Sequence, residues 1–262
     1  TGVQTCALPI FTAAVAESQD TRLCAAVDAA GNPLLGQDIG VLAEGAPAGV
    51  AVTSDLTAGV RAADAVIDFS LPASLETTVA VCREARKPLV TGITGLSQAQ
   101  IETLRQAAAV IPVVFAPNMS VGVNLMFKVA GQVAKVLGDS FDVEIVETHH
   151  RFKRDAPSGT ARRLAEVIAE SLGRDLDKVA CYGREGLSGE RPRDQIAIHA
   201  VRSGDGVGEH TVVVGALGER FEITHRAHSR DTFARGAVVA ARFVATAKPG
   251  LYDMQDVLGL KD

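Results

Sequence analysis

The chain has 262 residues, of which 47% are hydrophobic and 22% are charged, and its formal net charge is −5. This length allows one large domain or two small ones with a sizeable core. The acidic balance argues against nucleic acid or an anionic membrane as the partner. No apolar run reaches the roughly 20 residues that a membrane helix needs. The four cysteines are scattered without a C-x-x-C pair, which favours reduced thiols in a cytoplasmic protein.

The first ten residues differ in pattern from those that follow. Residues 1–10 show no strand periodicity, and Pro9 interrupts their apolar stretch, so we interpret them as a leader foreign to the fold. Residues 11–17 predict an alanine-rich helix, and residues 23–27 predict a short buried strand that ends at Asp28. A dinucleotide fold holds the adenosine ribose with an acidic residue at such a position. A lone Asp after an apolar run is more often only a turn residue.

Strands and helices then alternate regularly. Strands are predicted at 65–69, 88–91 and 111–116, and helices at 72–86 and 97–109. Ser97 and Gln100 have the spacing of a capping box at the start of the second helix. The alternation predicts a parallel sheet, which binds ligands at the carboxyl ends of its strands. Two loops, 92–96 and 116–120, fall at such ends, although each taken alone could be a simple tight turn.

The second half of the chain changes character after a predicted apolar helix at 121–137. Three β-rich runs at 195–202, 210–215 and 220–226 are separated by glycine turns and predict antiparallel hairpins. A last helix is predicted at 232–247. The fold class is therefore α/β. A Rossmann-like dinucleotide-binding domain without its first strand (residues 1–119 and 229–262) accompanies an α+β domain with a mixed, largely antiparallel sheet (residues 120–228).

The most distinctive stretch of the sequence is 147–160, which contains His149, His150 and Lys153 between a predicted strand and a predicted helix. Strand alternation predicts that the two imidazoles point to opposite faces. Ser158 and Thr160 are candidate N-caps, and the free N–H groups of a helix start attract anions.

These residue types suit a carboxylate ligand that must also receive a proton. Imidazole transfers protons near neutral pH, and a lysine ammonium donates a proton or holds negative charge. A metal ion is not expected, because the neighbours are cationic and no third ligand has a recognisable spacing. The alternative interpretation is a solvated basic strand end without a ligand.

The run His-His-Arg-Phe-Lys-Arg-Asp-Ala-Pro-Ser-Gly-Thr-Ala resembles the signature of the 4-hydroxy-tetrahydrodipicolinate reductase (dihydrodipicolinate reductase) family of the diaminopimelate–lysine pathway. The resemblance implies NAD(P)H-dependent reduction of a small dicarboxylate and a homotetramer formed through the C-terminal sheet. It implies His149 as general acid/base and Lys153 as proton donor. His150, Gly159 and Thr160 would bind the substrate carboxylates.

Residues 90–95 and 116–124 are similar to the two nicotinamide-side loops of this family. The resemblance assigns cofactor contacts to Gly92, Thr94, Ala116, Asn118 and Met119, in addition to Asp28, which is a candidate from its place at the strand end. Ile93 stands where the family usually has a hydroxyl side chain. Ala29 stands where members that use NADPH often have an arginine, so we expect NADH to be favoured.

The family's Gly-x-x-Gly-x-x-Gly loop has no counterpart here, because Gly2 is the only glycine before Asp28. A second interpretation is therefore a truncated, catalytically impaired homologue that binds the dicarboxylate but holds the cofactor weakly. A third, another nicotinamide dehydrogenase, finds no support in the 147–160 stretch.

Overall fold

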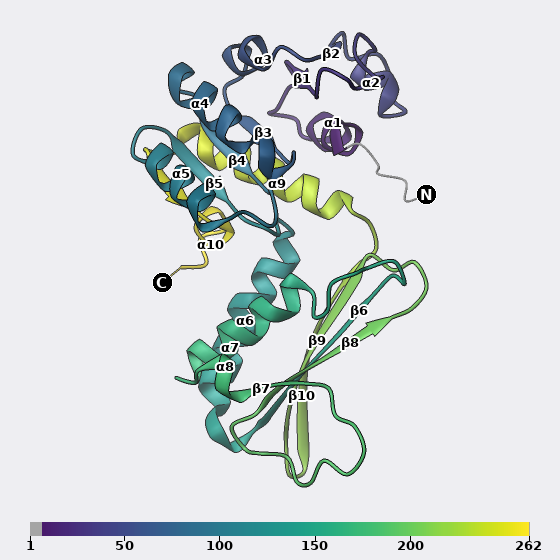
Figure 1. Cartoon of the computed structure of the whole chain (residues 1–262), viewed down its shortest axis with the longest axis vertical. Coiled ribbons are helices and arrows are strands. Elements are labelled where there is room, and N and C mark those ends of the chain that lie inside the picture. Colours follow the sequence, from purple (N-terminus) through teal and green to yellow (C-terminus); the bar gives the residue numbers. More distant parts are fainter. Residues whose placement is uncertain (1–6, 262) are drawn as a thin grey trace. The chain divides into compact units, whose positions relative to one another are not determined.

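The computed structural model describes residues 7–261, which form two compact units (Figure 1). The first unit extends to Val121 and resumes at Asp231, and the second comprises Gly122–Arg230. Each unit has its own hydrophobic core. No helix in the described part of the chain is long and apolar enough to cross a membrane.

The first unit begins with α1 (Ala7–Glu17), which starts four residues before the predicted helix. Residues 7–10 of the stretch interpreted as a leader belong to this helix, and residues 1–6 lie outside the described part. Pro9 is tolerated because it sits in the first helical turn, where its missing N–H has no intrahelical partner. Ile10 packs with Ala234 and Val238 of the last long helix.

The next elements form a small layer of their own. Strands β1 (Ala26–Val27) and β2 (Val52–Thr53) pair in parallel, and α2 (Ile39–Leu42) lies between them in the sequence. Ala26, Ile39 and Val52 are buried together in a small core. Strand β1 is shorter than the predicted strand at 23–27.

A four-stranded parallel sheet dominates the first unit, as predicted. Its order is β11-β5-β4-β3, from β3 (Val66–Asp68), β4 (Leu89–Thr91), β5 (Pro112–Phe115) and β11 (Gly250–Tyr252). Its helical elements are α3 (Leu56–Ala62), η1 (Pro72–Ser74), α4 (Leu75–Ala85), α5 (Gln98–Ala108), α9 (Asp231–Thr246) and α10 (Met254–Val257). On β4, Leu89 packs into the core with α4 and α5, and Val90 packs with α9. Both faces are thus covered, as in a doubly wound fold.

The two sheets of this unit remain separate. Within residues 7–261, no strand pairs with both β1 and β3 to join the two sheets. In the doubly wound order 3-2-1-4-5-6, the first strand occupies that position. The gap in strand pairing therefore lies at the position of the first strand, which the sequence predicted to be missing from the Rossmann-like fold.

The second unit contains one mixed five-stranded sheet with the order β10-β9-β6-β8-β7. Its strands are β6 (Asp142–His149), β7 (Ala180–Tyr182), β8 (Ile196–Arg202), β9 (Gly208–Ala216) and β10 (Glu219–Ala227). Its helical elements are α6 (Val121–Leu137), η2 (Gly138–Ser140), α7 (Gly159–Ser171) and α8 (Leu176–Val179). Helices α6 and α7 pack on one face of the sheet (Figure 1).

The prediction of consecutive antiparallel hairpins is wrong for β8. Only β9 and β10 form a hairpin, whereas β8 pairs in parallel with β6 and β7. The turn after β8 carries the chain across the end of β6, where Ser203 donates to the His149 carbonyl and His150 donates to the Gly206 carbonyl. Strand β9 consequently pairs with the other edge of β6.

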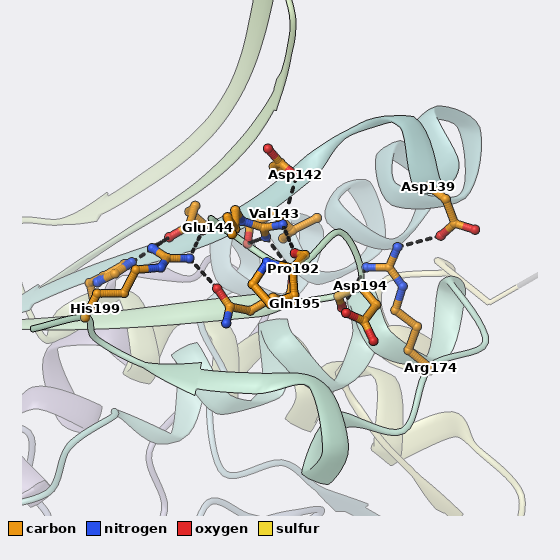
Figure 2. A network of polar contacts seen from close by, with 11 residues as sticks. Asp139, Asp142, Val143, Glu144, Arg174, Pro192, Asp194, Gln195 and His199 are labelled. Carbon is orange, nitrogen blue, oxygen red and sulfur yellow. Dashed lines mark hydrogen bonds and ion pairs between the residues drawn. The ribbon is translucent and has the colours of Figure 1, made fainter. Parts of the chain in front are cut away.

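On the sheet face opposite α6 and α7, a polar network fixes the loop 183–195 (Figure 2). The Glu144 carboxylate accepts hydrogen bonds of 2.7 and 2.9 Å from Arg184 and of 2.8 Å from Arg191. Nε2 of His199 lies 2.6 Å from the same carboxylate. Burial raises the pKa of Glu144, but the hydrogen bonds from Arg184, Arg191 and His199 outweigh burial and bring the pKa to about 2. Glu144 is therefore ionised and connects β6, β8 and the loop.

Candidate active site

The 147–160 stretch begins on β6, where alternate side chains point toward α6 and α7. Val143 and Ile145 belong to the core, and the next two positions on that face are Glu147 and His149. The strand register places His210 opposite Glu147 and Arg202 beside His149. The hydrophobic core thus continues at the end of β6 as a buried polar cluster, which we define as the buried Glu147, His149, Ser158 and His210 together with the half-buried Arg202.

Glu147 is the centre of this cluster and has no exposed surface. Its Oε2 lies 2.5 Å from His149 Nδ1 and 2.8 Å from Arg202 Nη1. Its Oε1 accepts from Arg202 Nη2 at 2.8 Å and from the Ser158 backbone N–H at 3.0 Å. Burial raises the pKa of the Glu147 carboxyl, but the hydrogen bonds from Arg202, His149 and Ser158 bring it below its usual value. Glu147 is therefore a carboxylate at neutral pH.

His149 is oriented by that carboxylate. Because an ionised carboxylate only accepts hydrogen bonds, Nδ1 of His149 carries the proton and Nε2 is left as the basic nitrogen. Burial lowers the pKa of His149, and the charges of Lys153 and Arg202 lower it further, against the opposing effect of Glu147. The imidazole is therefore largely neutral at pH 7 and able to accept a proton at Nε2.

Ser158 joins the cluster to the start of α7. It is the N-cap, because its Oγ accepts from the Ala161 N–H at 3.1 Å, whereas Thr160, the other candidate cap, lies inside the helix. The same Oγ lies 3.0 Å from Nε2 of His210. Burial, with a smaller contribution from His149, lowers the pKa of His210 to about 4. His210 is consequently neutral over the physiological range.

The first turn of α7 presents backbone donors beside the cluster. Gly159 and Thr160 are the first two helical residues, and Gly159 is exposed. Early N–H groups of a helix lack intrahelical partners and carry the positive end of its dipole, so this end is suited to a carboxylate. His150 follows β6 directly, and its buried Nδ1 has no hydrogen-bond partner among residues 7–261.

Lys153 lies in the connection between β6 and α7. Its backbone N–H donates to the His150 carbonyl at 3.1 Å. Its Nζ donates to both carboxylate oxygens of Asp155, at 2.9 and 2.8 Å. Lys153 is largely covered, with 20% of its side chain exposed, whereas 63% of Asp155 is exposed. The hydrogen bond from Lys153 is the main reason that the pKa of Asp155 lies below its ordinary value. The structure thus brings Lys153, His149, His150 and the α7 start into one region.

In the first unit, two of the loops predicted to contact the cofactor follow adjacent strands. Gly92 follows β4, and its N–H donates to the Asp68 carbonyl at 3.0 Å. A Cβ atom on Gly92 would collide with the Phe69 ring, so a larger residue would require the ring to move. Thr94 is exposed, whereas Ile93 is buried in the core with α4 and α5. Thr94 therefore offers a side chain at this edge, and Ile93 does not.

The loop after β5 contains the other three predicted positions of this sheet. Ala116 is buried, and its N–H donates to the Thr91 carbonyl at 3.2 Å. Met119 has no exposed surface and packs in the core with α9. Asn118 is half-buried, and its Oδ1 accepts from the Ser120 N–H at 3.0 Å. A ligand at this edge would meet the Asn118 side chain but only the backbone of Ala116 and Met119.

Asp28 follows β1 in the small two-stranded sheet. Its N–H donates to the Thr53 carbonyl at 2.9 Å, and its Oδ1 accepts from the Ala29 N–H at 2.7 Å. The carboxylate therefore stabilises the local turn, and it is half-buried rather than enclosed. This geometry is compatible with both interpretations drawn from the sequence, the ribose ligand and the turn residue.

Sequence reasoning missed three members of the buried polar cluster. Strand alternation alone places Glu147 on the same face as His149, so their pairing could have been predicted. Arg202 and His210 carry no such signal. Arg202 is 55 residues from Glu147, and His210 is 52 residues from Ser158. Their proximity depends on the strand order, which the sequence pattern does not give.

Comparison with known proteins agrees with both units. The family model described as "Dihydrodipicolinate reductase, N-terminus" matches residues 10–119, and the one described as "Dihydrodipicolinate reductase, C-terminus" matches residues 122–258. A 4-hydroxy-tetrahydrodipicolinate reductase of Citrifermentans bemidjiense is 54% identical over 249 residues, covering 95% of this chain and 93% of the relative. That of Nitrosomonas europaea is 52% identical over 247 residues, covering 94% and 92%.

Solved structures share the fold. A dipicolinate-bound dihydrodipicolinate reductase from Paenisporosarcina sp. TG-14 superposes with a TM-score of 0.75 at 24% identity, covering 96% of this chain and 95% of that one. An amine dehydrogenase from Mycobacterium smegmatis gives a TM-score of 0.60 at 14% identity, covering 94% and 91%. At these identities the likeness concerns the arrangement of elements alone.

Proposed function

Because the chain belongs to the dihydrodipicolinate reductase family, we propose that it reduces 4-hydroxy-tetrahydrodipicolinate to tetrahydrodipicolinate and water with a nicotinamide dinucleotide. Relatives of 54% and 52% identity support this reaction across both units. The structural observation that carries it is the grouping of His149 and Lys153 beside the α7 start.

The proton chemistry follows from the second unit. A hydride added to a conjugated imine leaves negative charge, and a positioned acid that quenches it accelerates such a step by ~10²–10⁴-fold. Lys153 is the proposed proton donor, since it lies in the connection that follows the strand carrying His149. His149 is the proposed general acid/base, with proton exchange at its basic Nε2. The exposed Asp155 would release Lys153 when substrate binds.

The substrate carboxylates are assigned to the end of β6 and the start of α7. Gly159 and Thr160 supply backbone N–H groups at the positive end of the helix dipole. His150 is the third proposed ligand, and its buried Nδ1 has no partner within the described chain. The three groups would hold one acid of a two-acid ligand while Lys153 faces the reacting part.

The cofactor is assigned to the first unit, through Asp28, Gly92, Thr94, Ala116, Asn118 and Met119. When bound, a nicotinamide dinucleotide would supply the hydride. The fit rests on two adjacent loops at the carboxyl ends of β4 and β5 and on an acidic residue at the end of β1. Ala29 after Asp28 supports a preference for NADH, because no cation is placed there for a 2′-phosphate.

A homotetramer formed through the C-terminal sheet is proposed for the assembly. On the sheet face opposite α6 and α7, Val201 is 42% exposed and Val146 and Val213 are half-buried. Antiparallel sheet regions often leave one such face for a partner. Sedimentation-velocity analysis should give a mass of about four chains, and a monomer at micromolar concentration would refute the assignment. The cytoplasmic location stays a prediction from the cysteine pattern.

The direct test is NAD(P)H oxidation, followed at roughly 340 nm with substrate generated in situ by the upstream synthase. Turnover that depends on the synthase product is the expected result. No turnover with either cofactor at millimolar concentration would refute the proposed reaction. A normal kcat with a greatly raised KM for the cofactor would instead identify weak cofactor binding as the limit.

A further inference from the structure

Every contact made by the Glu147 carboxylate is with a hydrogen-bond donor. Arg202 supplies two, the Ser158 backbone supplies one, and His149 Nδ1 is the fourth partner. A carboxylate accepts four hydrogen bonds without conflict, which no other side chain of this size can do. These four donors therefore favour an acidic residue at position 147. Beside its carboxylate, Nδ1 of His149 must be the protonated, donating nitrogen.

The opposite side of the imidazole is also constrained. A Cβ atom built on Gly208 would lie 2.8 Å from Nε2 of His149 and 3.1 Å from Cδ2. Glycine at this position of β9 thus leaves the space that the ring occupies. The ring is held between Glu147 at Nδ1 and the bare backbone of β9 at Nε2, with 8% of the residue exposed.

We propose that Glu147 is a positioning residue, which fixes the orientation of His149 and keeps its proton on Nδ1 so that Nε2 carries the proton transfer. The catalytic consequence rests on the proposed function of His149, whereas the tautomer itself does not. Three other groups face His149 from different elements: Arg202 from β8, His210 from β9 and Lys153 from the connection to α7. Among Glu147 and these three groups, Glu147 is the only anion, so it alone raises the pKa of His149.

Glu147→Gln tests this role because the amide has the shape of the carboxylate, but one of its two acceptor oxygens is replaced by an NH₂ donor. Its NH₂ must face either Arg202 and His149 or Arg202 and Ser158, all of which are donors. Arg202 opposes the NH₂ in either orientation, and only His149 can become an acceptor, by moving its proton to Nε2, so the NH₂ should face His149. The variant should therefore switch His149 to the Nε2-protonated tautomer and lower its pKa.

Imidazole ¹⁵N NMR of the full-length protein reads the tautomer directly, with the His149 signals assigned by their loss in His149→Asn. The unmodified protein should show the Nδ1-protonated form, and Glu147→Gln the Nε2-protonated form. An Nε2-protonated His149 in the unmodified protein overturns the proposal, even if Glu147→Gln does not fold. So does a folded Glu147→Gln variant that retains the Nδ1-protonated form.

Glu144→Gln is the matched control, because Glu144 lies on the same strand but on the opposite face. It contacts Arg184, Arg191 and His199 and is remote from the cluster. This variant should perturb the His199 signals and leave those of His149 and kcat unchanged.

Kinetics provide the second readout. Glu147→Gln should lower kcat by about 10²-fold, the lower part of the range for general acid–base groups, with KM altered less than threefold. Glu147→Asp should recover part of the loss. Equal loss of kcat in Glu144→Gln would contradict a specific role for Glu147. An unmodified protein without reductase activity would refute the proposed function, yet leave the tautomer measurement intact.

Discussion

The hydroxyl of Ser158 lies 3.0 Å from Nε2 of His210 and also accepts the Ala161 N–H at the start of α7. One side chain therefore caps a helix and hydrogen-bonds one nitrogen of a buried imidazole on β9. Both groups are nearly inaccessible, with 2% of Ser158 and 4% of His210 exposed. The start of α7 and the sheet are consequently held in a fixed relation by a hydrogen bond that water cannot replace.

Ser158→Ala should destabilise the protein by more than the loss of a cap. Losing an N-cap costs about 1 kcal/mol, and leaving a buried polar atom unpaired adds about 1–3 kcal/mol. Ser97→Ala is the control, because Ser97 caps α5 at an exposed position and touches no buried imidazole. Urea unfolding should show the larger loss for Ser158→Ala, and equal losses would contradict the coupling of cap and imidazole.

Because the pKa of His210 is lowered in the folded protein, we expect the protein to lose stability in mild acid. The pKa of His210 is lowered to about 4 in the folded protein, so the unfolded chain binds more protons between about pH 6.5 and 4. Stability should therefore be unaffected above pH 6.5 and should decrease by on the order of 3 kcal/mol as the pH falls through this window. His149 and His225 have pKa values lowered in the same direction and add to the effect.

Unfolding measured at pH 7 and pH 5 checks this prediction. His210→Asn should reduce the difference between the two pH values, whereas the exposed His228→Asn should preserve it. Working above pH 4.5 avoids the protonation of ordinary carboxylates. A pH dependence that is the same in His210→Asn and the unmodified protein would show that other groups dominate.

Gly208→Ala should impair catalysis with little change in the sheet. Its Cβ would lie 2.8 Å from His149 Nε2, so the ring must move, and a displacement of about 1 Å can cost on the order of 10²-fold in rate. Gly215→Ala is the control on the same strand, since a Cβ there meets nothing within 4 Å. The measurement is kcat at saturating substrate. Comparable rates for the two variants would mean that the position of His149 is unimportant.

Lys153 and Asp155 should differ sharply in their kinetic effect. Lys153→Ala removes the proposed proton donor and should lower kcat by ~10²–10⁴-fold. Asp155→Asn removes only a partner with 63% of its side chain exposed, whose ion pair is worth ~0.2–1 kcal/mol, so kcat should change less than about fivefold. Circular dichroism should show both variants folded. A Lys153→Ala enzyme within a few-fold of the parent would remove Lys153 from the mechanism.

The cofactor preference is open to direct measurement. We expect a higher kcat/KM with NADH than with NADPH, because Asp28 repels a 2′-phosphate and Ala29 offers no compensating charge. Ala29→Arg should shift the ratio toward NADPH, since arginine pairs well with phosphate. Comparable or better kcat/KM with NADPH in the unmodified protein would refute the expectation.

The sequence predicted those elements whose determinants are local. The capping box of Ser97 and Gln100 forms as expected, and α6 spans the predicted residues 121–137. The loops after β4 and β5 also lie at adjacent strand ends, because parallel strands fix that outcome. Local hydrogen-bonding chemistry and hydrophobic period were sufficient in each case.

What could not be predicted depends on contacts between distant segments. The prediction of a β8–β9 hairpin was wrong because β6, about 50 residues earlier in the chain, lies between the two strands and pairs with both. The short β11 at Gly250–Tyr252 has too few residues to show a period, and only its pairing with β5 makes it a strand. Arg202 and His210 join the buried polar cluster for the same reason, through the register of the sheet.

The burial of Met119 determines how evolution can alter the loop after β5. Its side chain is enclosed by α9, and Gly236 of that helix approaches its carbonyl so closely that no larger residue fits. Whether another hydrophobic residue is tolerated at position 119 therefore depends on how well it packs against α9. The two positions are therefore constrained separately: the side chain at 119 must suit the packing against α9, and position 236 must stay glycine because a backbone atom occupies the space of its Cβ.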